Sequence, residues 1–144
     1  MLKLMSIIGY FGMIGGLFGL LVTGNLFSPS PLVISLQASS IVLMAWARVT
    51  FGRRSYHVRA DPTDGGLMTK GPYRYIRHPI YAAICLFTLA GAAAHWSWST
   101  ALCEGAVLVS AVTRLLCEET LVAARYPEYA QYKATTWRMV PYVY

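Results

Sequence analysis

The sequence is poor in charged residues. Only 12% of its 144 residues are Asp, Glu, Lys or Arg, whereas 56% are hydrophobic. A soluble domain usually carries about 25% charged residues, so this composition argues against a soluble domain and favours a chain embedded in a lipid bilayer. The length is that of one compact unit, and we expect a single membrane-embedded domain over residues 1–144.

Acidic residues are the scarcest charged group. Asp and Glu number 6 against 12 Lys and Arg, which gives a formal net charge of +6. In a soluble protein this excess would suggest nucleic-acid binding. In so apolar a chain it is typical of the cytoplasmic loops of membrane proteins, which are enriched in Lys and Arg. We therefore expect membrane lipids, and no nucleic acid, among the partners.

Cysteine is also rare, and its spacing has no metal-binding pattern. Cys85, Cys103 and Cys117 are odd in number, far apart and surrounded by apolar residues. We interpret them as small core residues and predict neither a disulfide nor a metal site.

Four apolar segments make up most of the chain. Residues 4–27 contain no charge and would form a helix about 36 Å long, enough to cross a bilayer. Further apolar segments cover residues 32–51, 79–94 and 101–125. The sequence therefore predicts an all-α membrane protein with about four transmembrane helices.

Glycines recur along the first of these segments. Gly9, Gly12, Gly16 and Gly19 fall on one helical face. Small residues let helix backbones approach closely in membranes, so we expect another helix to pack against this face.

Basic residues are distributed unevenly among the connecting segments. The turns at 28–31 and 95–100 have no Lys or Arg, whereas residues 52–78 and the C-terminal tail are basic. The positive-inside rule then predicts that both termini and residues 52–78 are cytoplasmic. We expect Arg74 and Arg77 to serve mainly as membrane anchors, and Glu104 to lie at the outer interface without a functional role.

Two polar clusters flank the third and fourth apolar segments, at residues 73–81 and 114–121. If these segments form an antiparallel hairpin, the start of one lies beside the end of the other. Ionisable residues at membrane depth are costly and often mark function. Each could instead be a helix cap or a solvated helix end, so the residues alone predict only a polar pocket at the cytoplasmic face. Its members would be His78, Tyr81, Arg114, Glu118 and Glu119.

Several motifs in the second half resemble those of a known family. The segments "LMTKGPYRYIRHPIY", "EETL", "YPEYAQY" and "WRMVP" are similar to those of integral-membrane methyltransferases of the isoprenylcysteine carboxyl methyltransferase and phospholipid methyltransferase group. The resemblance covers about residues 67–141. It implies S-adenosylmethionine as cofactor, a cofactor pocket at the cytoplasmic face, and a lipophilic or lipidated methyl acceptor.

The resemblance also assigns roles to individual residues. It divides the chain into two packing helices, 1–51, and a cofactor-binding catalytic half, 52–144. Arg114 matches an arginine on the substrate side. Apart from the resemblance, the chemistry suggests that Arg114 could orient a carboxylate acceptor, and that Glu119 or His78 is a candidate base if the acceptor is an amine. Implied cofactor-binding residues are Gly66, Leu67, Met68, Tyr73, His78, Pro79, Tyr81 and Glu118. No metal is required.

We expect an integral membrane enzyme that methylates a carboxylate of isoprenylcysteine type. A phospholipid amine is the alternative acceptor. An NADPH-dependent membrane reductase, which carries a similar RHPxY segment, and a non-enzymatic four-span membrane protein are the remaining alternatives.

Overall fold

The computed structural model describes residues 1–52 and 66–144, and within them it is helical, without a strand. This agrees with the expected all-α class. The elements are α1 (Leu2–Val22), α2 (Pro31–Phe51), the 3₁₀ helix η2 (Gly71–Arg74), α3 (Pro79–Ala94), α4 (Trp98–Arg125) and α5 (Tyr129–Thr135).

The ends of the helices follow local sequence signals. Pro31 and Pro79 start α2 and α3, because proline has no N–H to leave unpaired at a first helical position. Ser97 caps α4 by accepting a hydrogen bond from the Thr100 N–H at 3.1 Å, so α4 begins three residues before the expected position 101. α1 ends at Val22 rather than at 27, because the chain turns at Gly24, which has a φ of +72°.

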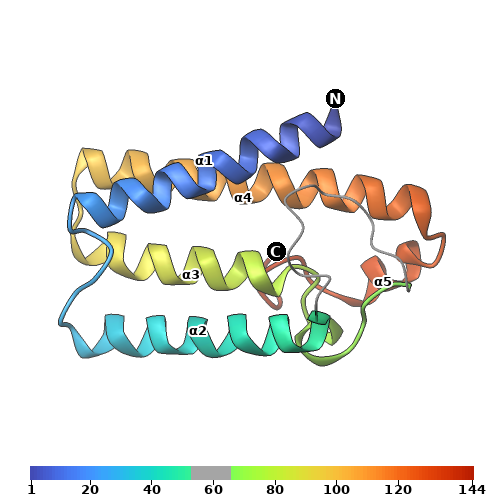
Figure 1. Ribbon diagram of the computed structural model, residues 1–144. Helices are drawn as coiled ribbons and strands as arrows, with labels where there is room; N and C mark the ends of the chain where they lie inside the picture. Colours follow the sequence, from blue (N-terminus) through green and yellow to red (C-terminus); the bar gives the residue numbers. More distant parts are fainter. Residues whose placement is uncertain (53–65) are drawn as a thin grey trace.

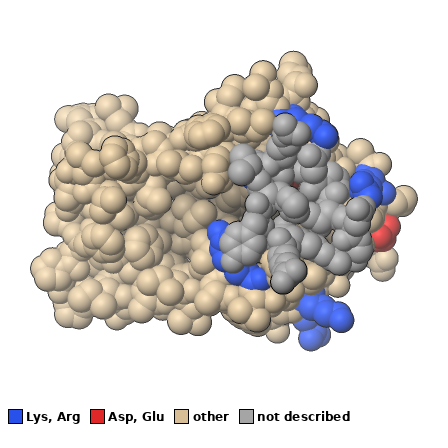
Figure 2. Space-filling view, viewed as in Figure 1, with Lys and Arg blue, Asp and Glu red and all other residues tan. Residues whose placement is uncertain are grey.

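The long helices pack in pairs (Figure 1). α1 lies along α4, α2 lies along α3, and α3 and α4 form the expected antiparallel hairpin. The start of α1, the end of α2, the start of α3 and the end of α4 therefore meet at one end of the bundle. Figure 2 shows Lys and Arg side chains at this end of the visible face, and none at the opposite end. Which side of a membrane this end faces remains a prediction.

Among residues 1–52 and 66–144, three helices, rather than the expected four, are long and apolar enough to cross a membrane: α1, α2 and α4. α3 is apolar but has only 16 residues, or about 24 Å, against a bilayer core of about 30 Å. Its start is fixed by Pro79 and its end by the turn that precedes the Ser97 cap, so it cannot lengthen at either end.

The glycine face of α1 packs against α4, as expected. A Cβ on Gly16 would lie 2.6 Å from the Cys103 carbonyl oxygen, and one on Gly9 would lie 3.0 Å from Arg114 Cγ. The Gly16 contact is too close for another residue unless the backbones move apart, and the Gly9 contact would require the Arg114 side chain to shift. The packing therefore places α1 directly against Arg114.

Glu104 lies inside the bundle rather than at its surface. Its side chain is buried between α3 and α4, where one carboxyl oxygen accepts a hydrogen bond from the Thr88 hydroxyl at 3.2 Å. The helix periodicity turns this residue toward α3. Glu104 is in the second turn of α4, so its expected depth near the outer interface stays a prediction.

Candidate active site

A three-residue cluster joins α3 to α4 at the polar end of the bundle. Arg114 and Glu118 lie one turn apart on α4, and Arg114 Nη2 is 3.3 Å from Glu118 Oε1. Arg114 Nε donates to the Tyr81 hydroxyl oxygen at 2.8 Å, and that hydroxyl in turn donates to Glu118. The hairpin thus brings these three side chains together, as the sequence predicted.

Helix α1 completes the surroundings of Arg114. Arg114 Nη1 donates to the Ser6 carbonyl oxygen at 3.1 Å, and the guanidinium carbon lies 5.2 Å from the centre of the Tyr10 ring. The side chain is only 4% exposed. A buried charge is tolerated when it is paired and hydrogen-bonded, and here three helices supply the partners.

Glu119, the neighbour of Glu118, is surrounded by a different set of groups. Arg77 Nε lies 2.9 Å and His78 Nε2 lies 3.3 Å from its Oε1, while Arg138 Nε lies 3.3 Å from its Oε2. His78 also reaches the other carboxylate, with Nδ1 3.8 Å from Glu118 Oε2. His78 therefore lies between the two carboxylates.

Arg77 is buried, contrary to the expectation of a membrane anchor. Besides Glu119, its guanidinium donates to the carbonyl oxygens of Thr136 and Lys133. Its burial follows from the packing of the C-terminal tail over this segment, which no local pattern in the sequence reveals. Arg74 is exposed, as an anchor would be.

The C-terminal tail holds the start of α3 by backbone hydrogen bonds. The N–H of Arg77 donates to the Trp137 carbonyl at 2.7 Å, and the N–H of His78 donates to the Arg138 carbonyl at 2.9 Å. Arg138 lies in the tail segment "WRMVP" but was not among the predicted site residues. An arginine within that segment was a usable signal.

The two acidic side chains differ in exposure. The Glu118 side chain is 27% exposed, whereas that of Glu119 is 7% exposed. Glu118 can therefore still meet a ligand, while the Glu119 carboxylate is enclosed by protein groups. Pro79 is almost completely buried, which fits a packing role at the start of α3.

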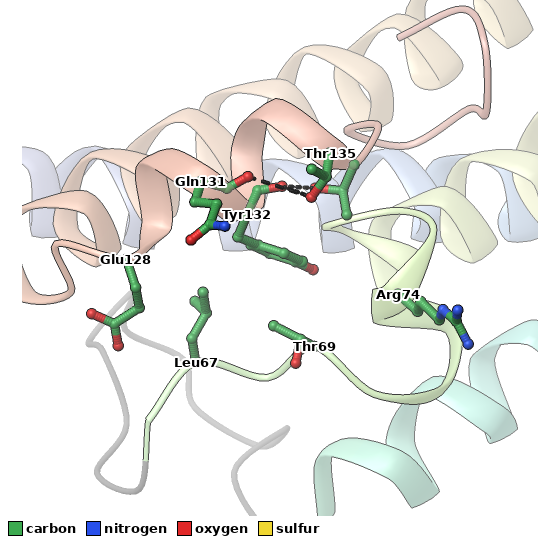
Figure 3. Close-up of a pocket in the computed structure, with 8 residues that line it drawn as sticks. Leu67, Thr69, Arg74, Glu128, Gln131, Tyr132 and Thr135 are labelled. Carbon is green, nitrogen blue, oxygen red and sulfur yellow. Dashed lines mark hydrogen bonds between the residues drawn. The ribbon is translucent and has the colours of Figure 1, made fainter.

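An open pocket of about 480 Å³ lies between the loop before η2 and α5 (Figure 3). Of the predicted cofactor-binding loop, Leu67 lines this pocket, whereas Gly66 and Met68 are not among its lining residues. Gly66 has a φ of +82°, a conformation that glycine adopts without strain. The full lining is Leu67, Thr69, Arg74, Glu128, Gln131, Tyr132, Thr135 and Thr136.

Tyr73 contacts the pocket-lining Tyr132 and is near enough to Glu118 to feel its charge. Its ring packs against Phe51, with centroids 5.3 Å apart, and its carbonyl oxygen accepts a hydrogen bond from the Tyr132 hydroxyl at 2.6 Å. Burial raises the pKa of Tyr73 above its ordinary value, and the nearby Tyr132 and Glu118 raise it further. Burial also raises the pKa of Tyr132, so its hydroxyl remains a donor at neutral pH.

Comparison with family models gives a match to the phospholipid methyltransferase family over residues 30–129. These 100 residues (129 − 30 + 1) are more than half of the chain. The chain belongs to the phospholipid methyltransferase family. Comparison with curated proteins and with solved structures gives no match.

Family membership makes the chain a membrane methyltransferase and confirms the resemblance. The matched residues include α2, α3, α4 and all five members of the predicted polar pocket. Four residues that contact this region lie outside the matched range. Ser6 and Tyr10 contact Arg114, Arg138 contacts Glu119, and Tyr132 contacts Tyr73. Thus α1 and the tail contribute contacts to this cluster from outside the matched range.

Proposed function

We propose that this protein transfers the methyl group of S-adenosylmethionine to a lipid-borne acceptor at the polar end of the helix bundle. The observation that carries the proposal is the partly exposed Glu118 carboxylate, which Tyr81 and Arg114 hold at the same end of the apolar bundle as an open pocket. The bundle suits a lipid acceptor, and the pocket suits a water-soluble donor.

The residues present fit this cofactor. When bound, it supplies a methyl group already activated by a sulfonium, so the protein needs neither a metal nor a covalent nucleophile. Glu118 is oriented by two hydrogen-bonding neighbours and remains accessible, so it can accept hydrogen bonds from a polar part of the cofactor. Holding reactants in line is then the main contribution, with a ceiling of roughly 7–11 kcal/mol.

Glu119 is better suited to holding the site than to accepting a proton. Its carboxylate is paired with Arg77 and Arg138, which favour the charged form. His78, between the two carboxylates, is the base that the geometry favours for an acceptor that must lose a proton.

We favour a phospholipid amine as the acceptor. A carboxylate acceptor of isoprenylcysteine type would be oriented by Arg114, but each nitrogen of that guanidinium already has a protein partner. An amine needs a base instead, and His78 meets that need. The family's description as phospholipid methyltransferases supports the same choice.

The test is methyl transfer from labelled S-adenosylmethionine by purified protein. One reaction contains a phospholipid amine as acceptor and a second contains an isoprenylcysteine carboxylate. A third contains NADPH and no methyl donor, and its oxidation is followed. We expect label in the amine lipid and none in the carboxylate. Label only in the carboxylate would overturn the choice of acceptor. Oxidation of NADPH without methyl transfer would overturn the proposal itself.

We further propose that the polar end faces the cytoplasm, which the basic residues there support. Lys70 is exposed at this end. A cysteine in its place should react with a membrane-impermeant reagent only in inside-out vesicles. Reaction in right-side-out vesicles alone would reverse the orientation.

A further inference from the structure

The pocket between the 66–70 loop and α5 is separate from the hydrogen-bonded groups around Glu118. Leu67 and Tyr132 face each other across it in Figure 3, with Glu128 and Gln131 toward one end. Its volume of about 480 Å³ is within the range of small-ligand pockets, about 300–1,000 Å³.

The lining is suited to a flat heterocycle attached to a sugar. The Tyr132 ring and the Leu67 side chain provide an aromatic and an aliphatic wall, and bases stack on such walls. The Glu128 carboxylate can accept from a vicinal diol, as acidic residues do from ribose in nucleotide sites. The Gln131 amide both donates and accepts, which suits the edge of a purine.

These polar groups are available for a ligand. Among residues 1–52 and 66–144, the carboxylate of Glu128 and the amide of Gln131 make no hydrogen bond to another side chain or to the backbone. Both residues are exposed and lie on or beside the short α5. Their arrangement is thus not explained by a structural contact.

The pocket shares its inner wall with the carboxylate site. The Tyr132 hydroxyl is bonded to the Tyr73 carbonyl, and the Thr136 carbonyl accepts from Arg77, which is paired with Glu119. The pocket lining is therefore connected to Glu119 through Thr136 and Arg77.

We infer that this pocket binds the adenosyl end of the methyl donor, with the base between Tyr132 and Leu67, the ribose hydroxyls on Glu128, and the base edge on Gln131. The inference rests on the proposed function and assigns a cofactor role to α5. Glu128 lies within the range of the family match, whereas Gln131 and Tyr132 lie beyond it.

The test is binding of S-adenosylhomocysteine to the full chain in detergent, measured by calorimetry, with adenosine and 2′-deoxyadenosine as competitors. Glu128→Gln should weaken S-adenosylhomocysteine binding about tenfold, as expected for loss of a hydrogen bond to a charged group. Gln131→Ala should also weaken it. Lys133→Gln, an exposed change on the same helix, should have no effect.

The deoxy competitor tests the contact itself. Adenosine should compete about tenfold better than 2′-deoxyadenosine on the wild type, and this preference should disappear in Glu128→Gln. An unchanged thermal midpoint would show that the variant is folded. Equal binding by the wild type, Glu128→Gln and Gln131→Ala would overturn the inference and leave the proposed function standing. Absence of binding by the wild type would instead remove the proposed function, and the inference with it.

Discussion

Glu118 and Glu119 are neighbours on α4, but they face different parts of the molecule. Consecutive helical residues point about 100° apart, so Glu118 meets Tyr81 and Arg114 while Glu119 meets Arg77 and Arg138. The first carboxylate keeps an exposed edge, and the second is enclosed. The difference indicates a division of labour, in which Glu118 meets the ligand and Glu119 holds the surrounding segments in place.

The largest effect on folding is expected from Glu119→Ala. This change would leave Arg77 buried, and Arg138 partly buried, without their carboxylate. Removing one member of a buried ion pair costs about 3 kcal/mol or more. We expect a strong fall in the thermal midpoint in detergent and a low yield of folded protein. A midpoint equal to that of the wild type would contradict the holding role.

The largest effect on ligand binding without unfolding is expected from Glu118→Ala. Its carboxylate is partly exposed, and Arg114 would keep its hydrogen bonds to the Tyr81 hydroxyl and the Ser6 carbonyl, so the loss in stability should be smaller than for Glu119→Ala. The affinity for S-adenosylhomocysteine should fall by about tenfold or more, because a hydrogen bond to a charged group is lost. Calorimetry of both variants checks this order, and an unchanged affinity would remove Glu118 from the ligand site.

Gly9→Val tests whether the packing of α1 against Arg114 supports ligand binding at Glu118. The new Cβ would lie 3.0 Å from Arg114 Cγ and 3.1 Å from the Ser110 carbonyl oxygen, so the Arg114 side chain or the α1–α4 packing would have to shift. Such overpacking costs about 1–3 kcal/mol, and the displacement should also weaken ligand binding. Gly15→Val is the matched control, because a Cβ there meets nothing within 4 Å among the described residues. Equal effects of the two changes would contradict this account.

The smallest effect is expected from Tyr132→Phe, which removes the hydrogen bond to the Tyr73 carbonyl. The cost should be about 1 kcal/mol in thermal stability. Because burial raises the pKa of Tyr132, the hydroxyl stays protonated below its ordinary pKa of about 10, and its contribution is lost only as the pH rises beyond that. The difference from the wild type should therefore be constant from pH 6 to pH 9. A difference that changes across this range would contradict the assignment.

Local signals made much of the fold predictable. Pro31 and Pro79 mark helix starts, and long runs without charge mark the helices themselves. The short turn before α4 forces a hairpin, which was enough to bring His78 and Tyr81 to the end of α4. The glycine face of α1 predicted close packing because a small residue every third or fourth position has a direct geometric meaning.

Contacts between distant segments were not predictable in the same way. Ser6 and Arg114 are 108 residues apart, and the hydrogen bond between them uses a backbone carbonyl, which every residue has. Arg138 and Tyr132 act through the fold of the tail, which has no hydrophobic period to reveal it. The same tail buries Arg77. Composition alone does not distinguish a buried arginine at this position from one that anchors the chain at the membrane surface.

The most direct test of the division of labour is a paired measurement on Glu118→Gln and Glu119→Gln, which keep the shape of each side chain and remove its charge. Thermal midpoint and affinity for S-adenosylhomocysteine would be measured for both. The account predicts that Glu118→Gln lowers the affinity with little change in midpoint, and that Glu119→Gln lowers the midpoint most. The account would be contradicted if Glu118→Gln lowered the thermal midpoint and left the affinity unchanged. It would also be contradicted if both variants changed midpoint and affinity to the same extent.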